Sequence, residues 1–447
     1  MAVAQERSSG WEIEAAAMSP RTTAADSADI FTRRWTAESV FAILLCVIVG
    51  LRIALPFNAP AGGVIGLLLV PLWLPLLRRA RLFVALAALL VAAAVAGVLL
   101  TWWMSTDHLA LPSSLVERSA LALGLLGAVG TLLWARTVIG LSAVSIAYGV
   151  GMTLGILGEI DASASWRFTF SIPLTILLMS IAARGDRLMP QLVIVVVLAA
   201  VGVLNDARSN TAMLLLAAVV LIWQRIGRAS GSGRRRAGNV VGVVLFGIAV
   251  FFVAQAAILE GFFGEATKDR TQAQISTSGS LLLGGRPEIA ASEALIRLNP
   301  WGMGSGIVAS PTDVTAAKSS MAAIGYDPHN NYVDRFMFGG GIEVHSMVGD
   351  FWLWFGLPGL AACAIVAVIA GMGLERALRE GACTVLAVYL ATRLMWDLAF
   401  SPAVSAMKTL PLALIVLAVP VSAVIAQRSS ARQGAPQGAA AADRRGT

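Results

Sequence analysis

Charged residues are scarce in this chain of 447 residues. Asp, Glu, Lys and Arg together make up 13%, whereas hydrophobic residues make up 57%. A soluble domain usually carries about 25% charged residues. The mean hydropathy of +0.77 is correspondingly high. This composition excludes an ordinary soluble domain and predicts a protein that folds in lipid.

Cysteine is also rare. The chain has three, Cys46, Cys363 and Cys383, and each falls inside an apolar run. Their spacing provides neither a disulfide framework nor a set of zinc ligands. We therefore expect no structural disulfide and no metal held by cysteine.

Two sequence motifs of nucleotide chemistry are missing. The chain has no G-x-x-x-x-G-K-[ST] segment, which excludes ATP hydrolysis by a P-loop. It also has no D-x-D segment, the acidic pair that metal-dependent enzymes often use on nucleotide sugars. A substrate that is not a nucleotide fits better, and we expect no cofactor and no metal.

Positive charge is present, and its position indicates topology. The chain has 33 Lys and Arg against 26 Asp and Glu, for a formal net charge of +7. Most of the basic residues lie in short links between apolar runs, on the sides that would face the cytoplasm. We therefore expect membrane lipid as a partner and no nucleic acid.

Apolar runs long enough to cross a bilayer recur along the chain. A transmembrane helix needs roughly 20 apolar residues, with a range of about 17–25. The predicted fold class is all-α, a polytopic transmembrane helix bundle of about 12 spans with both termini in the cytoplasm. The runs are 39–57, 61–77, 82–103, 119–134, 137–158, 168–183, 188–204, 211–224, 238–259, 348–372, 381–400 and 407–426.

One long segment interrupts these runs. Residues 260–347 carry six basic and nine acidic residues and form a large extracytoplasmic loop in this topology, with short helices. A loop of this length without a function is uncommon. The predicted regions are a disordered cytoplasmic tail over 1–36, helices 1–9 over 37–259, the loop over 260–347, helices 10–12 over 348–426 and a disordered cytoplasmic tail over 427–447.

Three polar residues share one setting. Arg208, Arg286 and His345 each stand next to the predicted start of a helix, and Pro287 favours the first helical position after Arg286. Free N–H groups and the helix dipole favour an anion there. A guanidinium can bind two phosphate oxygens at once, and the same positive helix end would keep an imidazole neutral. These residues are therefore candidates for phosphate binding and base catalysis.

Each candidate also has a structural interpretation. Arg208 can be an interfacial anchor, and Arg286 a solvated loop residue. Arg297 follows Glu293 by four residues, so a surface ion pair is expected. Arg393 and Asp397 have the same spacing inside a predicted span. A buried ion pair is the default there, although charges within a membrane often line functional cavities.

Histidine occurs three times, at His108, His329 and His345, always on the predicted outer side. His108 follows two tryptophans and is expected at the membrane interface. His329 lies in a turn-rich segment. No third ligand at metal spacing accompanies the two later histidines. His329 and His345 both remain candidates for a catalytic base.

The chain resembles the bacterial O-antigen ligase and O-antigen polymerase superfamily in three segments. Residues 208–211 (RSNT) resemble its Arg/Ser-rich helix start. Residues 285–287 (GRP) and 299–304 (NPWGMG) are similar to the Gly-Arg and Gly-x-Gly pattern of its large outer loop. Residues 345–346 (HS) and 355–359 (FGLPG) are similar to its histidine element before a Gly-Leu-Pro-Gly helix.

This resemblance implies a membrane glycosyltransferase in a bacterial cytoplasmic membrane. Its donor would be a glycan on polyprenyl diphosphate, and its acceptor a glycan or a lipid-linked saccharide. Arg208, Arg286 and Arg393 would bind the donor diphosphate. The family's histidine is commonly followed by Asn, as His329 is here, whereas His345 leads directly into a membrane helix and is favoured as the base. Ligase and polymerase differ only in their acceptor.

Two other classes of function compete with the enzyme. A transporter or flippase of lipid-linked saccharide should show repeat symmetry and helices broken near the membrane midplane. No matching halves occur in the sequence, and the polar groups gather outside the predicted spans. A receptor or structural membrane protein is the third possibility.

Overall fold

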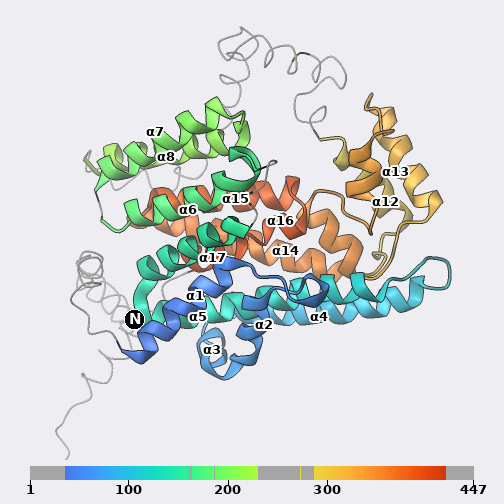
Figure 1. Ribbon diagram of the computed structural model, residues 1–447, viewed down its shortest axis with the longest axis horizontal. Helices are drawn as coiled ribbons and strands as arrows, with labels where there is room; N and C mark the ends of the chain where they lie inside the picture. The colour runs from blue at the N-terminus through green and yellow to red at the C-terminus, as the bar shows by residue number, and fades with distance from the viewer. Residues whose placement is uncertain are drawn as a thin grey trace, which may run out of the picture.

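The fold is described from a computed structural model, which places residues 36–158, 160, 164–185, 187–229, 272 and 286–418. The described chain is helical and contains no β-strand, in agreement with the all-α prediction (Figure 1). Four predicted features lie largely or wholly outside the described residues. They are the two tails, the span 238–259 and the first part of the large loop.

Three helices of the described chain are long and apolar enough to cross a membrane. They are α4 (Arg81–Met104), α5 with its short continuation (Pro112–Gly158) and α14 (Met347–Glu380). Shorter apolar helices include α1 (Ala37–Leu51) and α7 (Leu188–Leu204). The described helices therefore indicate a membrane protein, and the count of twelve spans stays a prediction.

Two predicted boundaries are displaced. The runs 119–134 and 137–158 correspond to α5 (Pro112–Gly155), whose helical geometry breaks at Gly140 and not at the predicted link around Arg136. Arg136 is helical, and its guanidinium donates to the carbonyls of Ile415 and Ala418. Conversely, the run 61–77 divides into α2 (Ala61–Leu68) and α3 (Val70–Leu77).

Glycine permits close packing around α5. A Cβ added to Gly63 would overlap the backbone of Gly124, and one added to Gly66 would overlap that of Gly127. Helices α2 and α5 therefore touch through their backbones. Small residues at such interfaces are typical of helices packed in lipid, where close van der Waals contact replaces the hydrophobic driving force.

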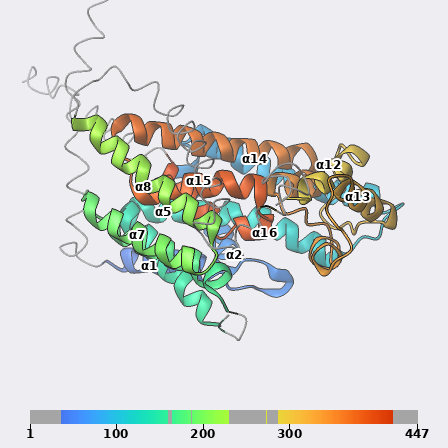
Figure 2. The ribbon, with the colours of Figure 1, turned by 90° about the horizontal axis from the view of Figure 1, so that it is seen from above.

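The described part of the large loop forms a cap on one end of the bundle. Its helices α12 (Glu288–Leu298) and α13 (Pro311–Ala323) lie beside the link between α4 and α5 in both views (Figures 1 and 2). Ser310 caps α13 by accepting from the Asp313 backbone N–H, and the Asp313 carboxylate accepts from the Ser310 N–H. This reciprocal pair fixes the start of α13.

A glycine turn fastens the loop to the bundle. The N–H groups of Met303 and Gly304 both donate to the Leu353 carbonyl, at 2.7 and 3.0 Å. That carbonyl lies beside Gly356, where α14 is interrupted by a left-handed residue with φ of 62°. The loop therefore docks against the break in α14.

The remaining helices complete the bundle around the C-terminal end of the described chain. Helix α15 packs against α8, α14 and α17. These and the other helices are α6 (Ser171–Ala182), α8 (Arg208–Ala229), α15 (Val385–Phe400), α16 (Ala403–Ala406) and α17 (Leu410–Leu417).

Candidate active site

His345 occupies a strained position directly before α14. Its φ of 51° lies in the left-handed region, which a residue with a Cβ seldom adopts. The residues on both sides of it are fixed. Ser346 caps α14 by accepting from the Gly349 N–H at 3.2 Å, and its hydroxyl donates to the carbonyl of Leu398. Strain of this kind persists only where the surroundings enforce it, and it is common at active sites.

Asp350 is the main anchor of this segment. It is completely buried, and its carboxylate accepts from the Val344 N–H at 2.7 Å and from the Ala403 N–H at 2.8 Å. One side chain thus joins the residue before His345 to α16. Sequence reasoning missed Asp350, although an acidic residue in the first turn of a membrane helix is a usable signal.

The imidazole of His345 faces two residues from the cap. Its ring centroid lies 5.0 Å from that of Tyr332. The Tyr332 hydroxyl in turn donates to the carboxylate of Glu288, in the first turn of α12. The other carboxylate oxygen of Glu288 is buried without a hydrogen-bond partner among the described residues. We call Arg286, Glu288, Tyr332 and His345 the histidine cluster.

Burial lowers the pKa of His345 below its ordinary value of 6.5. The charge of Glu288 and the carbonyl of Glu343 oppose this effect, and the charge of Arg286 adds to it. Nδ1 of His345 is buried and has no hydrogen-bond partner among the described side chains and backbone. The ring is therefore neutral near pH 7 and able to accept a proton.

Tyr332 is the complementary neutral group. Burial is the main cause that raises its pKa, and the adjacent Glu288 carboxylate raises it further. The phenol therefore stays protonated and remains a donor to Glu288. Neither residue was identified from the sequence, because nothing in their spacing distinguishes them from other loop residues.

The side chain of Arg286, which precedes α12, packs against the C-terminal end of α15, next to two aromatic rings of that helix. Its guanidinium carbon is 5.1 Å from the ring centre of Trp396 and 5.5 Å from that of Phe400. Nη1 donates to the Phe400 carbonyl at 3.2 Å. No carboxylate of the described residues forms an ion pair with it. As predicted, a helix begins just after Arg286, although Pro287 caps that helix instead of being its first residue.

Arg393 lies on α15 itself, one turn before Trp396, and has a different environment from Arg286. Its Nε is 3.0 Å from the Asp397 carboxylate, and both side chains are almost buried. Asp397 also accepts from the hydroxyls of Ser401 and Thr409. The predicted ion pair between Arg393 and Asp397 is confirmed.

Arg208 is the first residue of α8 and belongs to another ionic cluster. Its Nε donates to Asp206 at 2.8 Å, and Arg167 lies 3.9 Å from the same carboxylate. Two residues further, the Asn210 side chain accepts from the Tyr389 hydroxyl at 2.8 Å. The start of α8 is thereby bonded to α15, which also carries the aromatic rings beneath Arg286.

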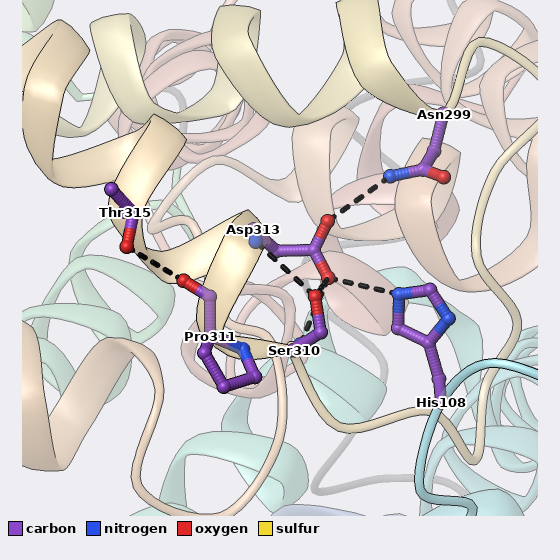
Figure 3. A network of polar contacts seen from close by, with 6 residues as sticks. All are labelled: His108, Asn299, Ser310, Pro311, Asp313 and Thr315. Carbon is purple, nitrogen blue, oxygen red and sulfur yellow. Dashed lines mark hydrogen bonds and ion pairs between the residues drawn. The ribbon is translucent and has the colours of Figure 1, made fainter.

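The other two histidines have different settings. His329 is exposed in a turn, where its backbone N–H donates to the Asp327 side chain. His108 is largely buried against the cap, and its Nε2 lies 3.0 Å from Asp313 (Figure 3). Its expected position at the membrane interface stays a prediction. Asp313 also binds Ser310, so His108 connects the α4–α5 link to α13. A metal site made of three His, Cys, Asp or Glu side chains is absent from the described part of the chain.

Comparison with known proteins adds no relative. No family model, curated protein or solved structure matches the chain. The functional argument therefore depends on the residues and their geometry.

Proposed function

We propose that this protein is a membrane glycosyltransferase. It moves a glycan from a polyprenyl-diphosphate carrier to an acceptor hydroxyl at the extracytoplasmic surface of a bacterial cytoplasmic membrane. The observation that carries the proposal is the histidine cluster, in which the charge of Arg286 acts on an imidazole of lowered pKa and no described carboxylate forms an ion pair with that arginine.

The diphosphate side of the reaction is assigned to Arg286. The aromatic rings hold its guanidinium in place without forming an ion pair, and it can still offer N–H groups to phosphate oxygens. Arg208, which binds Asp206 at the start of α8, is assigned as a second contact with the diphosphate. Arg393 is already paired with Asp397, and we assign it to stabilising α15, the helix on which Arg286 packs.

The proton side of the reaction is assigned to His345. The acceptor hydroxyl loses its proton to the imidazole while its oxygen bonds to the anomeric carbon of the donor. The bond from that carbon to the phosphate oxygen breaks, and the electron pair leaves on the diphosphate. Diphosphate is a good leaving group, so fixed positive charge stabilises it as it departs. The imidazolium then releases its proton to solvent. His329, exposed in its turn, is the alternative base.

A carrier of lipid-linked saccharide is the second candidate. The breaks at Gly140 and Gly356 in long helices favour it, because transporters bind their cargo at interrupted helices. A carrier would move the glycan across the membrane still attached to its lipid. An enzyme releases polyprenyl diphosphate.

The test is a reconstituted assay with an extract of the source organism's glycolipids. We expect release of polyprenyl diphosphate together with a longer or transferred glycan. Arg286→Lys should lower the rate roughly 10- to 100-fold, because a point charge replaces hydrogen bonds from a planar fork. Arg297→Lys is the matched control and should leave the rate unchanged, since Arg297 pairs with Glu293 on the exposed face of α12. Translocation without release would establish the carrier instead.

A further inference from the structure

A large cavity lies next to the histidine cluster and is separate from it. Its volume is about 600 Å³, within the range of small-molecule sites. Helices α1, α2 and α5 supply one wall, and the segment 335–343 supplies another. Arg286, Glu288, Tyr332 and His345 are not among its lining residues. Its polar lining includes Arg52, Asn58, Ser114, Glu117, Arg118, Tyr148, Arg335 and Glu343.

Positive charge is in modest excess in this cavity. Three guanidiniums face two carboxylates, and part of this charge is already engaged. Arg118 is buried, donates to the Ser305 carbonyl at 2.8 Å and lies 4.8 Å from the Trp354 ring centre. The Asn58 amide donates to Glu117 at 2.9 Å.

Glu343 carries one of the two carboxyl groups of this cavity, and its protonated form is favoured. Burial raises the pKa of its carboxyl group, and the nearby Glu117 raises it further, against the effect of Arg118. Carboxylates, amides and guanidiniums together offer both acceptors and donors. Hydroxyl groups require both, so this lining suits a ligand with many hydroxyls.

An exposed aromatic ring completes the lining. Phe336 contributes to the cavity although its side chain is 62% exposed. Large exposed apolar residues at a concave site often mark a binding surface. Pyranose rings have one face of C–H groups, which packs on an aromatic ring while their hydroxyls reach polar groups.

Glu343 also connects the cavity to His345. Its side chain lines the cavity, and its backbone carbonyl is the one that lies beside the His345 imidazole. Its N–H donates to the Met337 carbonyl at 3.0 Å, which ties it to the wall segment. The cavity wall and the candidate base therefore belong to one continuous segment of the chain, residues 335–345.

We infer that this cavity binds the acceptor saccharide, with its reacting hydroxyl directed toward His345. The inference rests on the proposed function, since it names the second substrate of the same reaction. Donor and acceptor then occupy different sides of the residues 343–345, the donor at Arg286 and the acceptor between α5 and the segment 335–343.

A covalent block tests this assignment. Cys46, Cys363 and Cys383 are all buried, so a cysteine placed at Phe336 is the preferred target of a bulky maleimide. Ala322→Cys, exposed on α13 and outside the cavity lining, is the matched control. Both variants are reconstituted in nanodiscs before and after labelling. Product is measured with the organism's glycolipid extract, and donor-site binding with fluorescent undecaprenyl diphosphate.

Labelled Phe336→Cys should form product at least about tenfold more slowly and bind undecaprenyl diphosphate as the unlabelled protein does. The labelled control should behave normally in both measurements. Full product from labelled Phe336→Cys would overturn the inference, and so would a parallel loss of diphosphate binding. If unlabelled wild-type protein neither binds the diphosphate nor forms product, the proposed function itself fails, which is a different result.

Discussion

Helix α15 borders two polar clusters that differ in how their positive charge is balanced. Near its C-terminal end, Arg286 of the histidine cluster lies against two aromatic rings and a carbonyl. One turn earlier, Arg393 is paired with Asp397 in a site where the two side chains are only 12% and 4% exposed. Similar residues at neighbouring positions therefore have different electrostatic surroundings.

The difference indicates which cluster serves the fold and which serves a ligand. A charge buried in an apolar bundle is tolerated when it is paired and hydrogen-bonded. Arg393 meets this condition within the protein. Arg286 forms no ion pair with a described carboxylate, and in the proposed function the donor diphosphate supplies the anion. We expect substitutions in the histidine cluster to reduce activity and those in the buried pair to reduce stability.

The largest effect is expected at His345. Replacing it with Gln removes the base, and general base catalysis typically contributes about 10²–10⁴-fold to a rate. Release of polyprenyl diphosphate by the reconstituted variant measures this loss. Its unfolding midpoint should stay near that of the wild type, because His345 is not a member of the buried pair.

His329→Gln provides the comparison for that measurement. Its side chain is exposed in a turn, so we expect a rate close to that of the wild type. If the two substitutions exchanged effects, the base would be His329, and the strained geometry at residue 345 would need another explanation.

The next effect is on stability, at Asp397. Asp397→Asn keeps the shape of the side chain and leaves the charge of Arg393 buried without a partner. Loss of one member of a buried pair typically costs about 3–5 kcal/mol in the free energy of unfolding. Unfolding by SDS in mixed micelles measures it. A variant of normal stability but with no activity would place Arg393 among the substrate-binding groups.

The sequence predicted the helices and the Arg393–Asp397 pair better than it predicted the contacts of the histidine cluster. Apolar runs predicted the helices, because burial in lipid requires them, and spacing of four residues predicted the pair Arg393–Asp397. Boundaries were less predictable. Within α5 the helical geometry breaks at Gly140 and not at Arg136, whose guanidinium donates to carbonyls of α17 and of the residue after it.

Only the residues of the site that stand at helix starts were predicted from the sequence. Arg286 and His345 stand at helix starts, which short-range patterns reveal. Glu288, Tyr332 and Asp350 contribute through contacts with residues distant in the chain, such as the bond from Ala403 to Asp350. Such contacts depend on tertiary packing, and no local pattern identifies them.

A change in pH dependence is expected from Glu288→Gln. The negative charge of Glu288 raises the pKa of His345 against the effect of burial. The neutral imidazole is the active form, so the rate rises as pH increases through that pKa. Removing the charge lowers the pKa further, and the acidic limb of the pH–rate profile should move to lower pH. An unmoved limb would show that the titrating group is not the imidazole beside Glu288.

The smallest effect is expected for an ion pair with the same spacing as the buried one. Glu293 and Arg297 are 59% and 76% exposed on α12. Glu293→Ala should change the free energy of unfolding by only about 0.3–0.5 kcal/mol, because water already solvates both charges. The same micelle titration used for Asp397→Asn measures it. A large loss at Glu293 would mean that spacing, and not burial, decides the strength of these pairs, and the contrast along α15 would lose its physical basis.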